Sequence, residues 1–171
     1  NLLVVADTNG DVFALEAETG EQRWSVRVTS EVLAAPAVND AVVVVQSHDG
    51  KLVGLHASNG ERRWQYEIDS PILTLRGTSP PILSDGMLIA GFANGKIVAL
   101  AADSGSLLWE NRLAIPQGRT ELERLIDIDG RAVLVDEVIY ASSYQGRIGA
   151  IAKASGRGIW YQNSSSVHDL A

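Results

Sequence analysis

The chain has 171 residues, no cysteine, and 14 basic side chains against 21 acidic ones. Without cysteine it has no disulfide scaffold, no thiolate metal site and no cysteine nucleophile. Its formal charge of -7 argues against a nucleic-acid binder and against a polybasic membrane-surface module, since both need a basic face. The longest unbroken apolar run, 97–102, is far shorter than the roughly 18 residues that indicate a membrane span.

Helical patterns are scarce, and an internal repeat dominates the sequence instead. In four segments, two glycines stand ten residues apart and a tryptophan follows four residues after the second glycine. All four tryptophans occupy this position, at steps of 40, 45 and 51 residues. The tryptophans are Trp24, Trp64, Trp109 and Trp160, and the second glycines are Gly20, Gly60, Gly105 and Gly156.

Each repeat predicts β-structure, because apolar residues alternate in segments such as 51–55 and β-branched residues crowd 42–45. The second unit predicts four strands, here called A to D, at about 34–38, 41–47, 51–57 and 62–68. Tandem four-stranded antiparallel units of this length are typical of an all-β β-propeller. We therefore expect the repeated tryptophans to fix blade against blade.

Glycine is also predicted to shape the turns of each blade. The dipeptides Asn9-Gly10, Asp49-Gly50 and Asn94-Gly95 between strands B and C suit a two-residue type I′ turn, which needs positive φ at both residues. The second glycine of each repeat is expected to close the C–D turn in a left-handed conformation that only glycine adopts cheaply.

The blade units fall at about 1–28, 34–68, 79–113 and 131–163, with the start of a further strand at 167–171. Four blades are the lower limit for a closed propeller. A closed ring in which 167–171 supplies the missing first strand is one hypothesis. The favoured hypothesis is an arc of a larger ring, and the missing initiator methionine and signal peptide agree with it.

The segment 14–24, with the sequence ALEAETGEQRW, resembles the A-L-D-A-x-T-G-x-x-x-W signature of the quinoprotein-like (PQQ-repeat) propeller superfamily. The copies at 54–64, 99–109 and 150–160 match more loosely. Enzymes and pure scaffolds share this signature, so it selects no function.

Within that superfamily, segments 71–80 and 119–129 resemble the propeller lipoproteins of the machinery that assembles β-barrels in the bacterial outer membrane. The short segments 30–33 and 166–169 fit the same family. The resemblance implies an eight-bladed ring at the periplasmic face of the outer membrane, held by a lipid anchor outside these residues. It also implies a non-enzymatic scaffold that docks to a BamA-like barrel-assembly protein and helps present unfolded outer-membrane protein clients.

Repeat length locates two special loops, at about 69–78 and 114–130, where the later repeats gain 5 and 11 residues. Both lie after strand D and before the next strand A. Strands reverse direction within a blade, so both loops are expected on the face that carries the B–C turns. Insertions grouped on one face of a repeat protein usually mark its binding surface.

The first loop carries Leu73, Leu75 and Arg76, and the second carries an acidic set that includes Asp127 and Asp129. Leucine beside arginine makes a plausible interface anchor, although the leucines can also tuck beneath the loop. The acidic residues can equally form an ordinary solvated loop, or pair with Arg76. The family resemblance implies that all five bind the barrel-assembly partner. A second hypothesis is strand addition at a blade's outer edge, for which the sequence selects no blade.

The main alternative is a quinone-dependent dehydrogenase fragment, since such enzymes share the repeat and bind pyrroloquinoline quinone with calcium. The chain lacks their vicinal cysteines, and the repeat uses all its tryptophans, so we expect no catalytic residue, cofactor or metal site. The Asp7-x-Asn9-x-Asp11 spacing imitates a calcium loop, but Val12 stands where that loop needs glycine. Another PQQ-repeat interaction or sensor propeller is a third class; a kinase sensor would need kinase motifs, which are absent from the chain.

Overall fold

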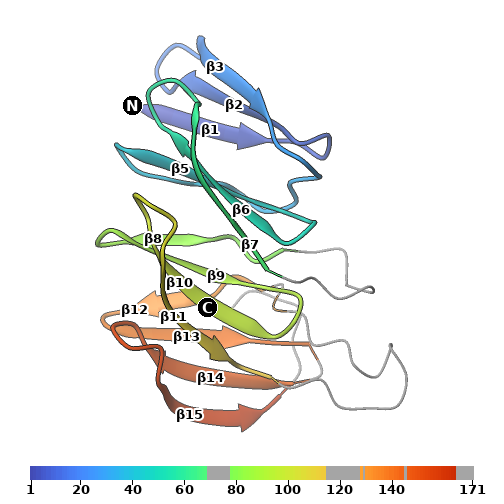
Figure 1. The fold of residues 1–171 in the computed structure, drawn as a ribbon, viewed down its shortest axis with the longest axis vertical. Helices are drawn as coiled ribbons and strands as arrows, with labels where there is room; N and C mark the ends of the chain where they lie inside the picture. The colour runs from blue at the N-terminus through green and yellow to red at the C-terminus, as the bar shows by residue number, and fades with distance from the viewer. Residues whose placement is uncertain (69–77, 115–127, 129, 145, 165–171) are drawn as a thin grey trace.

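The computed structural model describes residues 1–68, 78–114, 128, 130–144 and 146–164, and they form antiparallel sheets stacked in chain order (Figure 1). We number these sheets as blades 1 to 4. The strands of blade 1 are β1 (Leu2–Ala6), β2 (Asp11–Glu16) and β3 (Gln22–Arg27). The strands of blade 2 are β4 (Ala37–Val38), β5 (Val42–Ser47), β6 (Lys51–His56) and β7 (Arg62–Glu67).

Blades 3 and 4 have the same up-and-down order as blade 2. Blade 3 holds β8 (Ile82–Ser84), β9 (Met87–Gly91), β10 (Lys96–Ala101) and β11 (Leu107–Arg112). Blade 4 holds β12 (Val133–Val135), β13 (Val138–Ser142), β14 (Arg147–Ala152) and β15 (Gly158–Asn163). The prediction of an all-β fold made of four-stranded antiparallel blades is confirmed, with three strands described in blade 1.

The hydrophobic core lies between the blades. Strand β5 is buried along its whole length, because Val43 and Val45 pack toward blade 1 while Val42 and Val44 pack toward blade 3. Alternate side chains of a strand point to opposite faces of the sheet, so a run of valines covers both neighbours at once. A third apolar cluster joins blades 3 and 4 around Ile97 and Ile151.

The repeated tryptophan clamps each blade to the next. Trp24 Nε1 donates a hydrogen bond to the carbonyl of Ala57 at 2.9 Å, and Trp64 Nε1 does the same to Ala102 at 2.9 Å. The Trp24 ring lies against Gly60, where an added Cβ would approach ring carbon Cε3 to 2.6 Å. The structure therefore explains why tryptophan and the second glycine recur together. The tryptophan of one blade packs against the second glycine of the following blade, so the junction needs both residues.

The glycines of the C–D turns have the expected left-handed backbone, with φ between 67° and 75° at Gly20, Gly60, Gly105 and Gly156. The type I′ prediction for the B–C turns is wrong. In blade 2, Ser47 pairs with Lys51 across a three-residue loop, and within that loop only Gly50 has positive φ, at 82°. This geometry is typical of a type I turn followed by a left-handed glycine.

Candidate partner-binding face

The B–C turns lie on one face of the stacked blades, and we call it the B–C face. The residue that follows each D strand is tied to this face by the same backbone hydrogen bond in every blade. The amide of Ile68 donates to the carbonyl of Gly50 at 3.2 Å, and the amide of Leu113 donates to Gly95 at 2.9 Å. Both long connections therefore leave their blades on the B–C face.

The residues at which the two connections return lie together. Ser79 Oγ donates to the carbonyl of Gly130 at 3.0 Å, which joins the end of the first connection to the end of the second. Ile128 is buried against Gly91, where an added Cβ would approach the Ile128 side chain to 2.5 Å. The amide of Ile128 also donates a hydrogen bond to the carbonyl of Phe92, at 3.4 Å.

Gln46, a buried polar residue of blade 2, contacts blade 3 at Gly91, the residue against which Ile128 packs. Gln46 Nε2 donates to the carbonyl of Gly91 at 2.7 Å, while Gln46 Oε1 accepts no hydrogen bond from any described residue. The hydroxyls of Thr78 and Ser142 are likewise buried without a partner among the described residues. Sequence reasoning missed Gln46, although a polar residue that ends a run of valines is a usable signal.

The five predicted partner-binding residues, Leu73, Leu75, Arg76, Asp127 and Asp129, lie outside the described residues. Their roles therefore stay predictions. Only the residues that flank them are described, and these lie on the B–C face at neighbouring blades.

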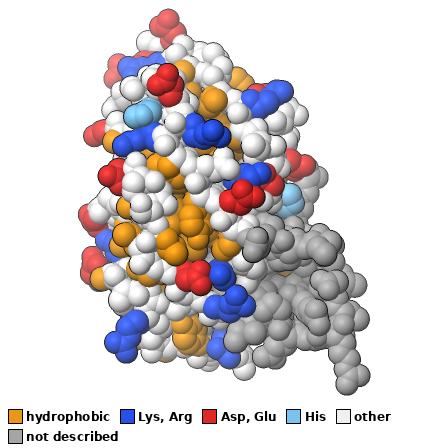
Figure 2. All heavy atoms as spheres, in the orientation of Figure 1, with side chains coloured by type: hydrophobic (Ala, Val, Ile, Leu, Met, Phe, Trp, Pro, Cys, Tyr) orange, Lys and Arg blue, Asp and Glu red, His pale blue; other side chains and the backbone are white. Residues whose placement is uncertain are grey.

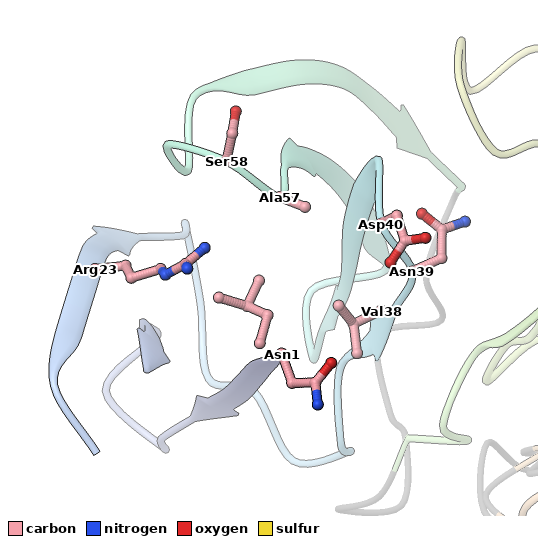
Figure 3. Close-up of a pocket in the computed structure, with 8 residues that line it drawn as sticks. Asn1, Arg23, Val38, Asn39, Asp40, Ala57 and Ser58 are labelled. Carbon is pink, nitrogen blue, oxygen red and sulfur yellow. The ribbon is translucent and has the colours of Figure 1, made fainter. Parts of the chain in front are cut away.

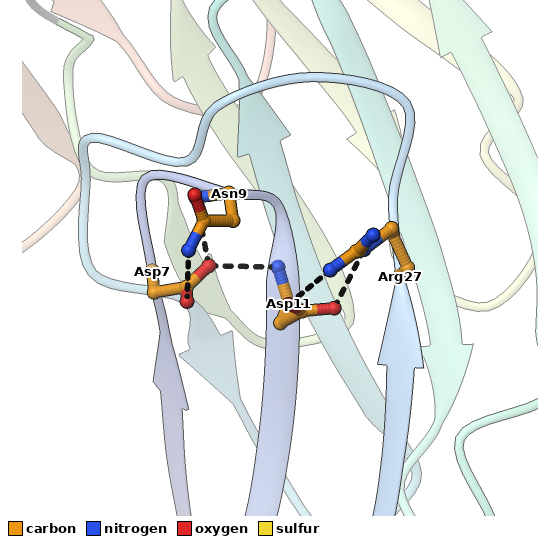
Figure 4. A network of polar contacts seen from close by, with 4 residues as sticks. All are labelled: Asp7, Asn9, Asp11 and Arg27. Atoms are coloured by element: carbon orange, nitrogen blue, oxygen red, sulfur yellow. Dashed lines mark hydrogen bonds and ion pairs between the residues drawn. The ribbon is translucent and has the colours of Figure 1, made fainter.

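The acidic B–C turn of blade 1 is a hydrogen-bonded hairpin (Figure 4). Asp7 Oδ1 accepts from the amides of Asn9 and Asp11 at 2.8 and 2.9 Å, and these bonds hold the pKa of Asp7 below its ordinary value against the desolvation that raises it. Asp11 accepts two bonds from Arg27, at 2.8 and 2.6 Å, and this pairing lowers the pKa of Asp11. The carboxylates that imitate a calcium loop are thus engaged in turn and strand contacts.

Asp49 lies in the B–C turn of blade 2, at the position that Asn9 holds in blade 1, and it is more enclosed than Asp7. Burial raises its pKa, but hydrogen bonds from Lys51, Ser47 and Thr29 outweigh the burial, so the net pKa is lowered. Asp49 therefore stays ionised at neutral pH and binds β5, β6 and the segment after β3 together. Such contacts fix the shape of the B–C face at this turn.

A cleft of about 540 Å³ lies between blades 1 and 2 (Figure 3). Residues of β1 and β3 line it on the side of blade 1, and the A–B and C–D turns of blade 2 line it on the other side. Its walls include Arg23, Val38, Asn39 and Asp40.

Among the described residues, no group of three or more His, Asp or Glu side chains is arranged to hold a metal ion. No helix in the described part of the chain is long and apolar enough to cross a membrane.

A family model described as "Outer membrane protein assembly factor BamB" matches residues 1–171. The chain belongs to the BamB family. BamB of Alteromonas naphthalenivorans is 42% identical to it over 170 residues, which are 99% of this chain and 41% of that protein. The chain thus spans well under half the length of this relative.

The structural comparison agrees. The crystal structure of BamB from Moraxella catarrhalis matches with a TM-score of 0.94 and 32% identity, over 99% of this chain and 52% of that one. A quinohemoprotein alcohol dehydrogenase from Comamonas testosteroni matches with a TM-score of 0.78 over 97% of this chain and 34% of that one, at only 17% identity. The dehydrogenase likeness shows the fold alone, whereas the BamB likeness extends to the sequence.

Proposed function

We propose that the chain is part of a non-enzymatic scaffold of the outer-membrane β-barrel assembly machinery. The observation that carries this proposal is the match of all 171 residues to the assembly-factor family. In this role the propeller sits at the periplasmic face of the outer membrane, anchored by lipid outside these residues. It docks to a BamA-like barrel-assembly protein and helps present unfolded outer-membrane protein clients.

Docking is assigned to the B–C face, through Leu73, Leu75, Arg76, Asp127 and Asp129. The bond from Ser79 to Gly130 supports this assignment, because it brings the return points of the two connections together. Buried Ile128 and Gln46 support it further, since they give these connections a rigid base. Apolar area beside an arginine fork suits a hot spot, and neighbouring carboxylates suit a basic counterpart on the partner.

The test is capture of the barrel-assembly protein by immobilised variants. Leu75→Arg and Arg76→Ala are each expected to reduce capture by about tenfold or more, the scale of a lost interface anchor. Arg63→Ala, at the far end of a D strand, is the matched control and is expected to retain wild-type capture. Full retention by both test variants, with unfolding curves equal to wild type, would exclude this docking site.

The dehydrogenase alternative has a separate assay. The protein is supplied with pyrroloquinoline quinone and calcium, and oxidation of alcohols and sugars is followed with an artificial electron acceptor. A scaffold is expected to give the rate of the protein-free control. Turnover that depends on the protein would contradict the non-enzymatic assignment without bearing on the B–C face.

A further inference from the structure

Among the described strands, β3, β7, β11 and β15 each end their sheet, so the outermost strand of each blade has one backbone edge without a described partner. A free edge pairs with other chains unless charged side chains, proline or a bulge protect it. All four strands carry the same irregularity two residues into the strand, where one extra residue precedes the tryptophan. The extra residues are Arg23, Arg63, Leu108 and Ile159.

This shared register lets equivalent positions be compared, and they differ between blades. Blades 1 and 2 begin their outer strand with Gln22-Arg23 and Arg62-Arg63. Blade 3 begins with Leu107-Leu108, which are 48% and 51% exposed, and blade 4 has Ile159, which is 55% exposed. Arginine at the bulge thus guards two edges, while exposed aliphatic side chains take its place on the other two.

Strand β15 is the least protected of these edges. Its sequence, GIWYQN, contains no charged residue and no proline, whereas β3, β7 and β11 each contain at least two charged residues. Tyr161 lies beside blade 3, because its hydroxyl and the Asn111 side chain are hydrogen-bonded at 3.0 Å. We call Leu107, Leu108, Ile159 and Tyr161 the apolar rim strip. Figure 2 shows hydrophobic side chains exposed on the face turned to the viewer, near mid-height and again toward the lower end.

Among the described residues, the charges at the two ends of β15 are basic. Arg157 directly precedes the strand, and Arg147 pairs with Asn163 at its other end and lies 5.9 Å from the centre of the Tyr161 ring. Glu110 of β11 is already paired with Lys96. A strand that pairs with β15 therefore runs along an uncharged edge with an arginine near each end. This arrangement favours a partner strand that is apolar in the middle and acidic at both ends.

We propose that the free edge of β15 and the apolar rim strip bind one extended client segment by strand addition. The occupant is a transmembrane strand of an unassembled outer-membrane β-barrel, with apolar residues at alternate positions and an acidic residue at each end. This deepens the proposed function, on which it rests, by naming the edge that takes the client. Barrel strands alternate in hydrophobicity over about ten residues, and strand addition supplies backbone hydrogen bonds with pockets for alternate side chains.

The test is fluorescence anisotropy with a labelled peptide of about ten residues that alternates valine and threonine between terminal glutamates. Ile159→Arg, which copies the arginine of blades 1 and 2, is expected to weaken binding at least about tenfold. Leu108→Arg is expected to weaken binding less, since Leu108 lies on β11 of the preceding blade and not on the paired strand. Arg63→Lys, at the equivalent position of blade 2, is the control and is expected to bind like wild type.

Two altered peptides separate strand addition from simple apolar contact. N-methylation of alternate amides removes backbone donors and keeps the side chains, so it is expected to abolish binding. Exchange of the terminal glutamates for lysines is expected to weaken binding, and this loss is expected to shrink in high salt. Equal binding of the N-methylated peptide, or wild-type affinity in a folded Ile159→Arg variant, overturns the proposal.

Self-association is the competing occupant. If sedimentation shows that the wild-type protein dimerises, and the peptide does not compete, then a second copy covers the β15 edge and the proposal fails. Ile159→Arg is expected to capture the barrel-assembly protein as well as wild type does. Failure at this edge is therefore distinguishable from failure at the B–C face.

Discussion

The junction between blades 2 and 3 and the junction between blades 3 and 4 use the same clamp in different surroundings. Trp64 is 8% exposed, bonds to the Ala102 carbonyl and lies against Gly105. Trp109 is less buried, bonds to the Lys153 carbonyl at 2.8 Å and lies against Gly156. Both junctions thus use the same tryptophan contact, and we expect its contribution to stability to grow with the burial of the tryptophan ring.

The second junction adds ionic contacts that the first lacks among the described residues. Lys153 stands where the other repeats have alanine, and its side chain is 6% exposed while it contacts Asp85 and Glu137. Asn111 also donates to the Gly156 carbonyl at 2.7 Å. One replacement within the repeat therefore adds ionic contacts to a joint that elsewhere relies on apolar packing and uncharged hydrogen bonds.

The largest expected effect comes from emptying the clamps. Trp64→Ala removes a buried ring and a hydrogen bond and is expected to cost about 4 kcal/mol of unfolding free energy. Trp109→Ala is expected to cost about 3 kcal/mol, since less of its ring is buried and the polar contacts remain. Urea unfolding followed by tryptophan fluorescence measures both variants. A larger loss for Trp109→Ala would reverse the comparison and make the polar junction the stronger joint.

The next effect tests the glycine half of the clamp. Gly105→Ala forces alanine to adopt a φ of 69° and brings its Cβ within 2.7 Å of the Trp64 ring. Gly20→Ala has a similar φ of 73° but meets no atom within 4 Å, so it isolates the backbone strain. We expect about 1 kcal/mol for Gly20→Ala and about 2–3 kcal/mol for Gly105→Ala, where overpacking is added. Equal losses in urea unfolding would mean that the ring moves aside freely.

The sequence predicted the blades well, because each unit repeats both the strand alternation and the punctuating glycines. It failed at the B–C turns, because a short-range dipeptide does not reveal loop length. The residue pair with two positive φ values, Asp85 at 50° and Gly86 at 75°, lies in the A–B turn of blade 3 instead. There Ser84 pairs with Met87 across two residues, as a type I′ turn requires.

The candidate sites show a different limit of sequence reasoning. Counting residues between tryptophans located the two long connections, but not that Ser79 and Gly130 meet or that Gln46 supports them. Those contacts join segments 45 and 51 residues apart in the chain. The outer-strand bulges could be found only from the strand register, although the change from arginine to leucine and isoleucine is visible in the aligned repeats.

The smallest expected effect concerns the ionic contacts of Lys153. Its hydrogen bond lowers the pKa of Asp85, and Asp85 in turn raises the pKa of Lys153. A carboxyl with a lowered pKa stabilises the fold above its unfolded value of about 4, and this contribution is lost as pH falls through its folded pKa. A lysine with a raised pKa stabilises the fold below its unfolded value of about 10.4, and loses this contribution as pH rises through its folded pKa.

Lys153→Met is therefore expected to flatten the fall in stability below about pH 4, measured by urea unfolding across the pH range. Lys96→Met, at the exposed pair with Glu110, is the control and is expected to leave the acid limb unchanged. An acid limb identical in Lys153→Met and wild type would show that the ionic contacts of Lys153 add no measurable stability to the blade 3–4 junction.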